Sequence, residues 1–289
     1  MAMSYATLED IRVEAGDAPE PTTTTTYYRN LTEYGIRASQ MIDRLAGFTF
    51  APMIDTRYMD AFSETTSAYR VFLNYPLLEL TTCVLADDTS LTVATDVIAA
   101  MRHYSPKRWL QMLTSSYNFR TSSGNPSSEL VVTGVWGWHS DYDNAWLLSG
   151  DKVLDAAGLT ATAVTITVAD ADGAGGNGFT PRFSPGNLIK IDSEYCEVVS
   201  ISSNTLTVTR GARGSTAAVH LINAPISVYF PDEPITRACA KLAVYLYTQR
   251  GSVAQVSFEG VSGNRNPPTI IAEVRDMILP YQFIQFAGV

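Results

Sequence analysis

The sequence predicts an α+β fold in which N- and C-terminal helices form a helical body, the middle section is β-rich, and a small β-barrel or β-sandwich module is inserted. Apolar residues near both ends recur at helical spacing, and those in residues 60–146 alternate as in strands. Residues 183–220 hold short alternating runs separated by tight turns. We therefore expect an outer domain from residues 1–149 and 230–289, and an inserted module from residues 150–229.

The N-terminal part predicts two helices. Thr7 precedes an apolar stripe and Asp10 follows three residues later, which is the spacing of a capping box. The Pro- and Thr-rich residues 17–26 indicate an extended linker. A second helix is expected over residues 27–46, because its apolar residues keep helical spacing and Gly47 stands where a helix-ending glycine belongs.

The middle section has the two-residue period of strands. One run alternates before Pro76 and a second run alternates after it, which predicts two strands separated at the proline. In a later run Gly134 interrupts the alternation, and we expect a β-bulge there. These alternating apolar or aromatic positions are Tyr69, Val71, Leu73, Tyr75, Leu78, Leu80, Val84, Leu130, Val132, Trp136 and Trp138.

The inserted module and the last helices follow. Strands are expected over residues 187–191, 194–201 and 205–209, with polar tight turns between them. A helix is then predicted from about Asp232 to Arg250. The last helix begins near Pro268 and ends before Pro280.

Composition bounds the possible functions. Net charge is −9 and only 17% of residues are charged, so the chain has no overall basic surface for gripping nucleic acid. If the protein meets DNA, we expect it to repel the duplex or let it slide rather than bind it. The three cysteines, Cys83, Cys196 and Cys239, form no CxxC pair, which predicts reduced, partly buried thiols. Neither a signal peptide nor a membrane span is predicted.

No catalytic, metal-binding or cofactor-binding site is predicted. Residues 173–178 formally match GxGxxG, but strand periodicity follows instead of a helix, so a loop is expected. His139, Asp141 and Asp143 would bind a metal only if their side chains shared one face, and a hydrogen-bonded loop is the alternative. Asp170 and Asp172 lack the spacing of a calcium loop.

Two further features have open interpretations. Arg210 and Arg213 in Arg-Gly-Ala-Arg-Gly would contact a phosphate, or form structural ion pairs or bonds to loop backbone. The C-terminal segment carries Tyr281, Phe283, Ile284 and Phe286 without a charged side chain. These four residues either fold back onto their own core or dock on a partner.

Residues 183–220 resemble a β-module that recurs in structural proteins of tailed bacteriophages. The matching positions are Phe183, Gly186, Ile189, Ile191, Glu194, Val198, Ile201, Asn204, Leu206, Val208, Arg210, Gly211, Gly214, Ala217 and His220. The flanking segments SYATLEDIR, ASQMIDRLAGFTFAP, RVFLNYPLLEL, VVTGVWGW, ITRACAKLAVYLYTQR and AEVRDMILPY are similar to the head–tail connector (adaptor) family of these phages.

The resemblance implies a virion protein that is assembled in the host cytoplasm and is not an enzyme. It implies a ring, commonly of twelve copies, that sits below the portal protein, continues the DNA channel and contacts downstream neck or tail proteins. It also implies that the C-terminal segment engages the portal, with Tyr281, Phe283, Ile284 and Phe286 at that interface. No cofactor and no membrane contact are implied.

Other functions stay open at this point. A baseplate, tail-tip or fibre-associated protein would use the same β-module. A carbohydrate-binding module is a second class, because Trp136, Trp138 and fifteen tyrosines offer aromatic rings. An enzyme is a third class, and it would require a role for a residue such as His139.

Overall fold

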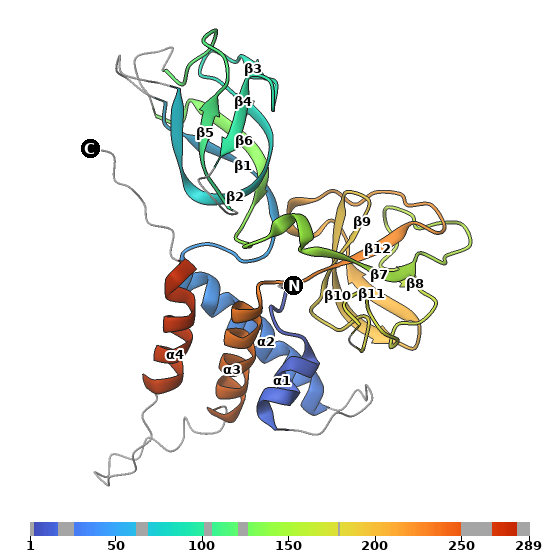
Figure 1. Cartoon of the computed structure of the whole chain (residues 1–289). Coiled ribbons are helices and arrows are strands. Elements are labelled where there is room, and N and C mark those ends of the chain that lie inside the picture. Colours follow the sequence, from blue (N-terminus) through green and yellow to red (C-terminus); the bar gives the residue numbers. More distant parts are fainter. Residues whose placement is uncertain are drawn as a thin grey trace. The chain divides into compact units, whose positions relative to one another are not determined.

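The protein is described from a computed structural model that places residues 3–16, 26–61, 69–100, 106–120, 127–178, 180–249 and 268–281. The chain forms two compact units, and Figure 1 labels their helices and strands. Unit 1 contains Met1–Gly47 and Ala145–Gln282. Unit 2 contains Phe48–Asn144, from the middle of the sequence.

Unit 2 is built on a six-stranded antiparallel sheet in the order β1-β6-β2-β5-β4, with β3 paired to β2. Its elements are β1 (Met53–Met59), β2 (Arg70–Val84), β3 (Ser90–Leu91), β4 (Val97–Ala100), β5 (Lys107–Met112), β6 (Leu130–Trp136) and the 3-10 turn η1 (Tyr142–Asn144). Alternate residues of these strands, among them Val71, Leu110 and Val132, form one buried core. The strand periodicity predicted within residues 60–146 is thus confirmed, while β1 was not predicted.

The long strand β2 runs through Pro76, where the sequence predicted a separation into two strands. Its pairing with β5 shifts register between Phe72 and Leu77, so the proline lies in an irregular part of the ladder. Gly134 of β6 lies very close to the backbone of the neighbouring strand β2. A Cβ added at Gly134 would stand 2.3 Å from the Glu79 carbonyl oxygen. Register shifts flank Glu79. The irregularity predicted at Gly134 therefore lies in the partner strand, and glycine is required by the close approach.

Unit 1 contains a second six-stranded antiparallel sheet, in the order β7-β12-β9-β10-β11-β8. Its elements are β7 (Trp146–Lys152), β8 (Thr165–Thr167), β9 (Leu188–Ile191), β10 (Glu194–Ser202), β11 (Thr205–Thr209), η2 (Ala212–Gly214) and β12 (Pro225–Tyr229). The three strands predicted over residues 187–209 are confirmed as β9, β10 and β11. Just beyond β7, the Leu154 N–H donates to the Thr167 carbonyl of β8 at 2.8 Å. The two ends of the sheet thereby meet around a core that includes Phe183 and Ile226.

Four helices also belong to unit 1. They are α1 (Leu8–Ala15), α2 (Thr26–Ala46), α3 (Glu233–Gln249) and α4 (Pro268–Ile278), which continues into the 3-10 turn η4 (Leu279–Tyr281). The predicted capping box is confirmed, since Thr7 and Asp10 cap α1 reciprocally. Helices α1, α2 and α4 pack against α3. At the α2–α3 contact the Ser39 hydroxyl lies 3.3 Å from the buried Cys239 thiol.

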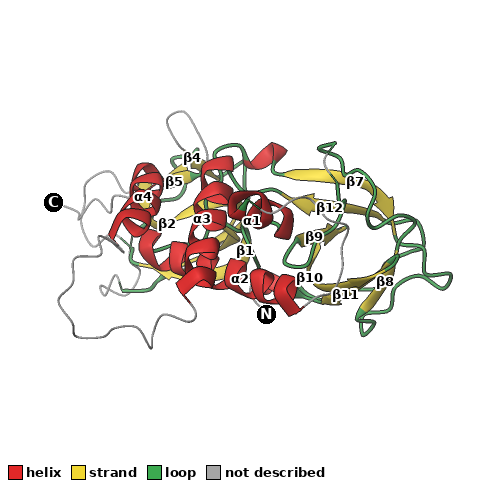
Figure 2. Ribbon diagram, turned by 90° about the horizontal axis from the view of Figure 1, so that it is seen from below, coloured by secondary structure: helices red, strands yellow, loops and turns green. Residues whose placement is uncertain are grey.

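The predicted fold class is wrong. The protein is mostly β-sheet, with two antiparallel sheets of six strands and four helices, and the terminal helices do not form a body of their own. Figure 2 shows this balance of strands and helices. The physical reason is that each sheet closes over its own apolar core, whereas the helices share unit 1 with one of the sheets. The domain boundaries at residues 150 and 229 stay a prediction.

A helix that spans a bilayer must be both long and apolar. Among the described residues, no helix meets both requirements.

Candidate interaction site

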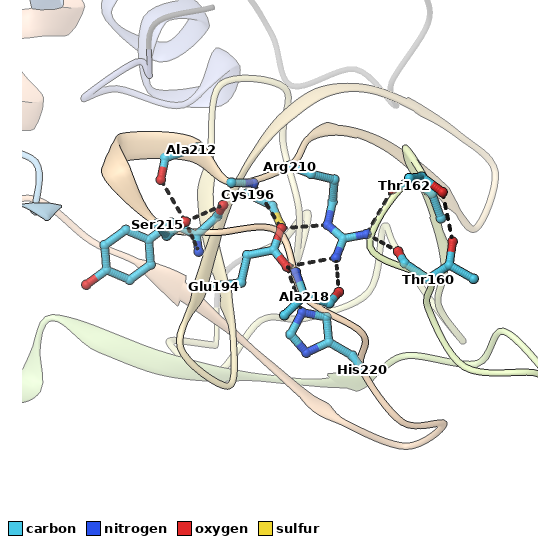
Figure 3. Close-up of polar contacts among 12 residues, drawn as sticks. Thr160, Thr162, Glu194, Cys196, Arg210, Ala212, Ser215, Ala218 and His220 are labelled. Carbon is cyan, nitrogen blue, oxygen red and sulfur yellow. Dashed lines mark hydrogen bonds and ion pairs between the residues drawn. The ribbon is translucent and has the colours of Figure 1, made fainter.

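The most connected polar group of the described residues is the carboxylate of Glu194, at the start of β10. Its side chain is fully buried and receives Arg210 Nε at 2.6 Å and Arg210 Nη2 at 2.7 Å, one on each oxygen. The N–H groups of Gly211 and Ala218 donate to the same carboxylate at 2.9 and 2.8 Å. Figure 3 shows this bidentate pair at the centre of the network. A buried charge with this many donors is well compensated.

Arg210 uses its remaining donors to hold two loops, the first formed by residues 158–164 and the second by residues 216–222. Its Nη1 donates to the carbonyl oxygens of Thr160 and Ala163, at 2.8 and 2.9 Å, and its Nη2 donates to that of Ala218 at 2.6 Å. All five N–H groups of the guanidinium therefore have an acceptor. The predicted alternatives of a structural ion pair and a bond to loop backbone are both confirmed for Arg210, which leaves no donor free for a phosphate.

His220 closes the network from the second loop. Its ring is buried, with Nε2 at 2.9 Å from Glu194 and Nδ1 at 2.7 Å from Asp192 in the β9–β10 turn. Its backbone pairs with that of Leu159 in the first loop. The three side chains Glu194, Arg210 and His220 thus bind one another, and all three belong to the pattern of residues 183–220. Together they hold residues 158–164 against residues 216–222.

These two loops present an exposed apolar surface. We call Val164, Val219, Leu221 and Ile222 the apolar tip; their exposed fractions are 56, 69, 78 and 45%. Apart from the buried His220, the loops carry no ionisable side chain. A buried polar network therefore fixes the backbone directly beneath exposed apolar side chains, an arrangement that suits binding to another protein.

The network also sets the protonation of its acid. Burial by itself raises the pKa of Glu194, but hydrogen bonds from Arg210, the Ala218 N–H, His220 and the Gly211 N–H outweigh it and lower the pKa to about 2. The neighbouring Cys196 thiol is affected in the opposite direction: burial and then the charge of Glu194 raise its pKa to about 12.

We expect unit 1 to lose stability in acid. Because the pKa of Glu194 is lower in the folded state than its ordinary 4.5, its contribution is complete above about pH 4.5 and is lost as the pH falls towards 2. The shift corresponds to about 3 kcal/mol. Urea unfolding at a series of acidic pH values measures this loss, and the slope should be much smaller in Glu194→Gln. An equally steep slope in that variant would contradict the assignment to Glu194.

A second buried carboxylate holds the glycine-rich loop. Asp151 accepts the N–H groups of Ala169 and Asp170 at 2.9 to 3.1 Å and Arg182 Nη1 at 2.9 Å. Burial raises the pKa of Asp151, but the hydrogen bonds to Ala169, Asp170, Lys152 and Arg182 lower it overall. No helix begins within residues 173–178, so the predicted loop is confirmed.

The other sequence candidates do not gather into a site. His139 is buried and its Nδ1 accepts the Asp141 N–H at 2.9 Å, while Asp141 receives the Asn144 side-chain amide at 2.8 Å, as the hydrogen-bonded-loop alternative expects. Over the described ranges, no three His, Cys, Asp or Glu side chains cluster as metal ligands. All three cysteines are free and buried.

The C-terminal candidates are described only in part. Tyr281 is partly buried in η4, and burial followed by the charge of Asp232 raises its pKa. Phe283, Ile284 and Phe286 lie outside the described residues, as does His103.

Sequence reasoning recognised the pattern that contains Glu194, Arg210 and His220 but not their mutual contact. The available clue was that the only acid, arginine and histidine of that pattern stand among apolar and glycine positions, where unpaired charges are costly. The Asp151–Arg182 pair was missed, and nothing in the spacing of 31 residues pointed to it.

Comparisons with protein-family models, with curated proteins and with solved structures each find no match to this chain.

Proposed function

We propose that this protein is a structural protein of a tailed-bacteriophage virion, where it forms a ring-shaped head–tail connector below the portal and continues the DNA channel. The observation that carries the proposal is the network of Glu194, Arg210 and His220, the polar core of the phage-like pattern. These side chains act on the protein's own loops, and their position favours a scaffolding role over chemistry on a substrate.

Exposed apolar surface supports a role in assembly. The apolar tip is held on fixed backbone, so little conformational entropy is lost when another protein covers it. The C-terminal segment adds Phe283, Ile284 and Phe286, which we propose dock on the portal together with Tyr281. Large, apolar contacts of this kind are typical of obligate assemblies.

Net charge supports the proposed channel. At −9, the chain repels the phosphate backbone, and Arg210 is fully engaged with protein acceptors. A channel lined by such subunits lets DNA slide, because it offers few cations to which phosphates would bind.

A role elsewhere in the tail, at the baseplate, tip or fibre, would use the same module and is the nearest competing function. The carbohydrate-binding alternative is less well supported. Trp136 and Trp138 are 1 and 8% exposed, so neither ring presents a face for stacking on a sugar.

Co-purification with the phage's portal protein tests the proposal. We expect the full-length chain to associate and a chain truncated after Pro280 to lose association, because the truncation removes all four proposed contact residues. Leu148→Asp is a matched control, since Leu148 is 64% exposed on β7 and should not affect binding. Retained association after truncation would remove the proposed role of the segment, and failure of the full-length chain to associate would reject the connector.

A further inference from the structure

Unit 2 presents an aromatic surface on the outward side of β2 and β5. In the register of this pair, Arg70 lies opposite Gln111 and Phe72 lies opposite Trp109, while the alternate pair of Val71 and Leu110 is buried in the core. Ile98 of β4 lies opposite Gln111 on the other side. We call this surface the aromatic face; it comprises Arg70, Phe72, Ile98, Trp109 and Gln111.

The aromatic face combines exposed carbon with one fixed cation. Phe72 is 54% exposed, and its ring meets that of Trp109 at 6.3 Å in an edge-on arrangement. The Arg70 guanidinium lies 5.1 Å from the centroid of the Trp109 ring and donates to Gln111 at 3.2 Å. Trp and Arg are among the side chains that most often dominate protein–protein binding energy, and Phe is enriched in interfaces.

Two cations of this strand pair, Arg70 and Lys107, have no acidic partner among the described residues. No carboxylate of the described part of the chain lies within 4.0 Å of Arg70 or of Lys107, which precedes Trp109 by two residues on β5. A partner that brings negative charge to Arg70 and Lys107 would therefore be electrostatically complementary to them.

Unit 2 also carries exposed acidic side chains that are complementary to these cations. Asp87 and Asp88 are exposed in the turn between β2 and β3, and Asp87 is oriented by the Thr89 N–H, which donates to it at 3.1 Å. Within the described part of the chain, neither aspartate forms an ion pair. Two unpaired anions therefore stand in the same compact unit as two unpaired cations.

We propose that the aromatic face of one copy binds the Asp87–Asp88 turn of a second copy. The two surfaces differ, so the contact is head-to-tail and repeats from copy to copy. It closes into a ring in the assembly described under the proposed function, on which this part of the inference rests. The aromatic carbon supplies most of the affinity, and the charges supply orientation and association rate.

The alternative occupant, nucleic acid, fits less well. Tight duplex binding neutralises many phosphates, whereas Arg70 and Lys107 supply two positive charges in a chain that is acidic overall.

Charge reversal on the full-length chain tests the contact. The face variant is Arg70→Glu with Lys107→Glu, and the turn variant is Asp87→Lys with Asp88→Lys. Each variant alone juxtaposes like charges, so we expect its self-association, measured by sedimentation at low salt, to weaken by at least about tenfold. An equimolar mixture pairs a negative face with a positive turn and a positive face with a negative turn, and we expect it to recover the assembly of the unmodified protein.

A matched control separates a specific effect from a change in net charge. Arg44→Glu with Lys152→Glu makes the same charge change at two exposed positions of unit 1 and should leave assembly intact. Recovery in the mixture together with an intact control supports the proposal. The proposal would be overturned if the control disrupted assembly equally or if the mixture stayed dissociated. It would also be overturned if the unmodified protein were retained on DNA and the face variant were not.

The same data separate this inference from the proposed function. A ring that forms, binds the portal and ignores both reversals rejects the aromatic face alone. Charge-dependent association in a protein that neither binds the portal nor enters the phage neck rejects the connector while the contact stands. A protein that remains monomeric at every concentration and with the portal present rejects both.

Discussion

An Arg210→Met variant is expected to lose about 3–5 kcal/mol of unfolding free energy, because Glu194 stays buried without its cation. The same change removes the donors that hold Thr160, Ala163 and Ala218. Hydrogen exchange in residues 158–164 and 216–222 should therefore rise further than in the rest of unit 1. Urea unfolding and exchange of the full chain measure the two effects.

Two further variants make this prediction specific. Arg37→Ala removes an arginine from an exposed i,i+4 pair with Glu33, and we expect a loss below about 1 kcal/mol. Replacing both partners, with Glu194→Leu and Arg210→Met together, should recover part of the loss because no buried charge remains unpaired. A single Arg210→Met variant that is as stable as the Arg37→Ala variant would contradict the proposed role of the network.

A Trp136→Ala variant is expected to destabilise unit 2 by about 3–5 kcal/mol. Trp136 is 1% exposed within the core, and its Nε1 donates to the Asp55 carbonyl at 3.0 Å. The Arg57 guanidinium also lies 4.6 Å from the centroid of its ring. Truncation would therefore leave a cavity and an unused carbonyl at one site, and chemical denaturation measures the combined loss.

Phe72→Ala is the matched control for this loss. Its ring is 54% exposed, so we expect an effect on stability below about 1 kcal/mol. If Trp136→Ala were folded and as stable as Phe72→Ala, the ring would not be a core residue. A role in ligand stacking would then have to be reconsidered.

Local signals in the sequence were sufficient for strands β9, β10 and β11 and for the N-terminal cap of α1. Asp192 and Ser203 adopt positive φ in the tight turns on either side of β10, and short polar residues of this kind mark such turns. The strands between the turns were consequently placed to within a residue. The capping box at Thr7 and Asp10 is equally local, which explains why it was predicted correctly.

Contacts between residues far apart in the sequence could not be predicted from these local signals. Glu194 and Arg210 are brought together by the pairing of β10 with β11, and His220 by the loop that follows. Strand β1 shows no clean alternation, and β2 continues through Pro76 because its ladder is irregular there. Helical periodicity at the chain ends was read as a separate body, although only packing decides whether such helices share a unit with a sheet.

Electron microscopy of intact phage particles, with this protein located by labelling, tests the central claim most directly. We expect a ring of copies at the head–tail junction, in contact with the portal through the C-terminal segment. Finding the protein only at the tail tip, on the fibres or outside the particle would contradict a connector function.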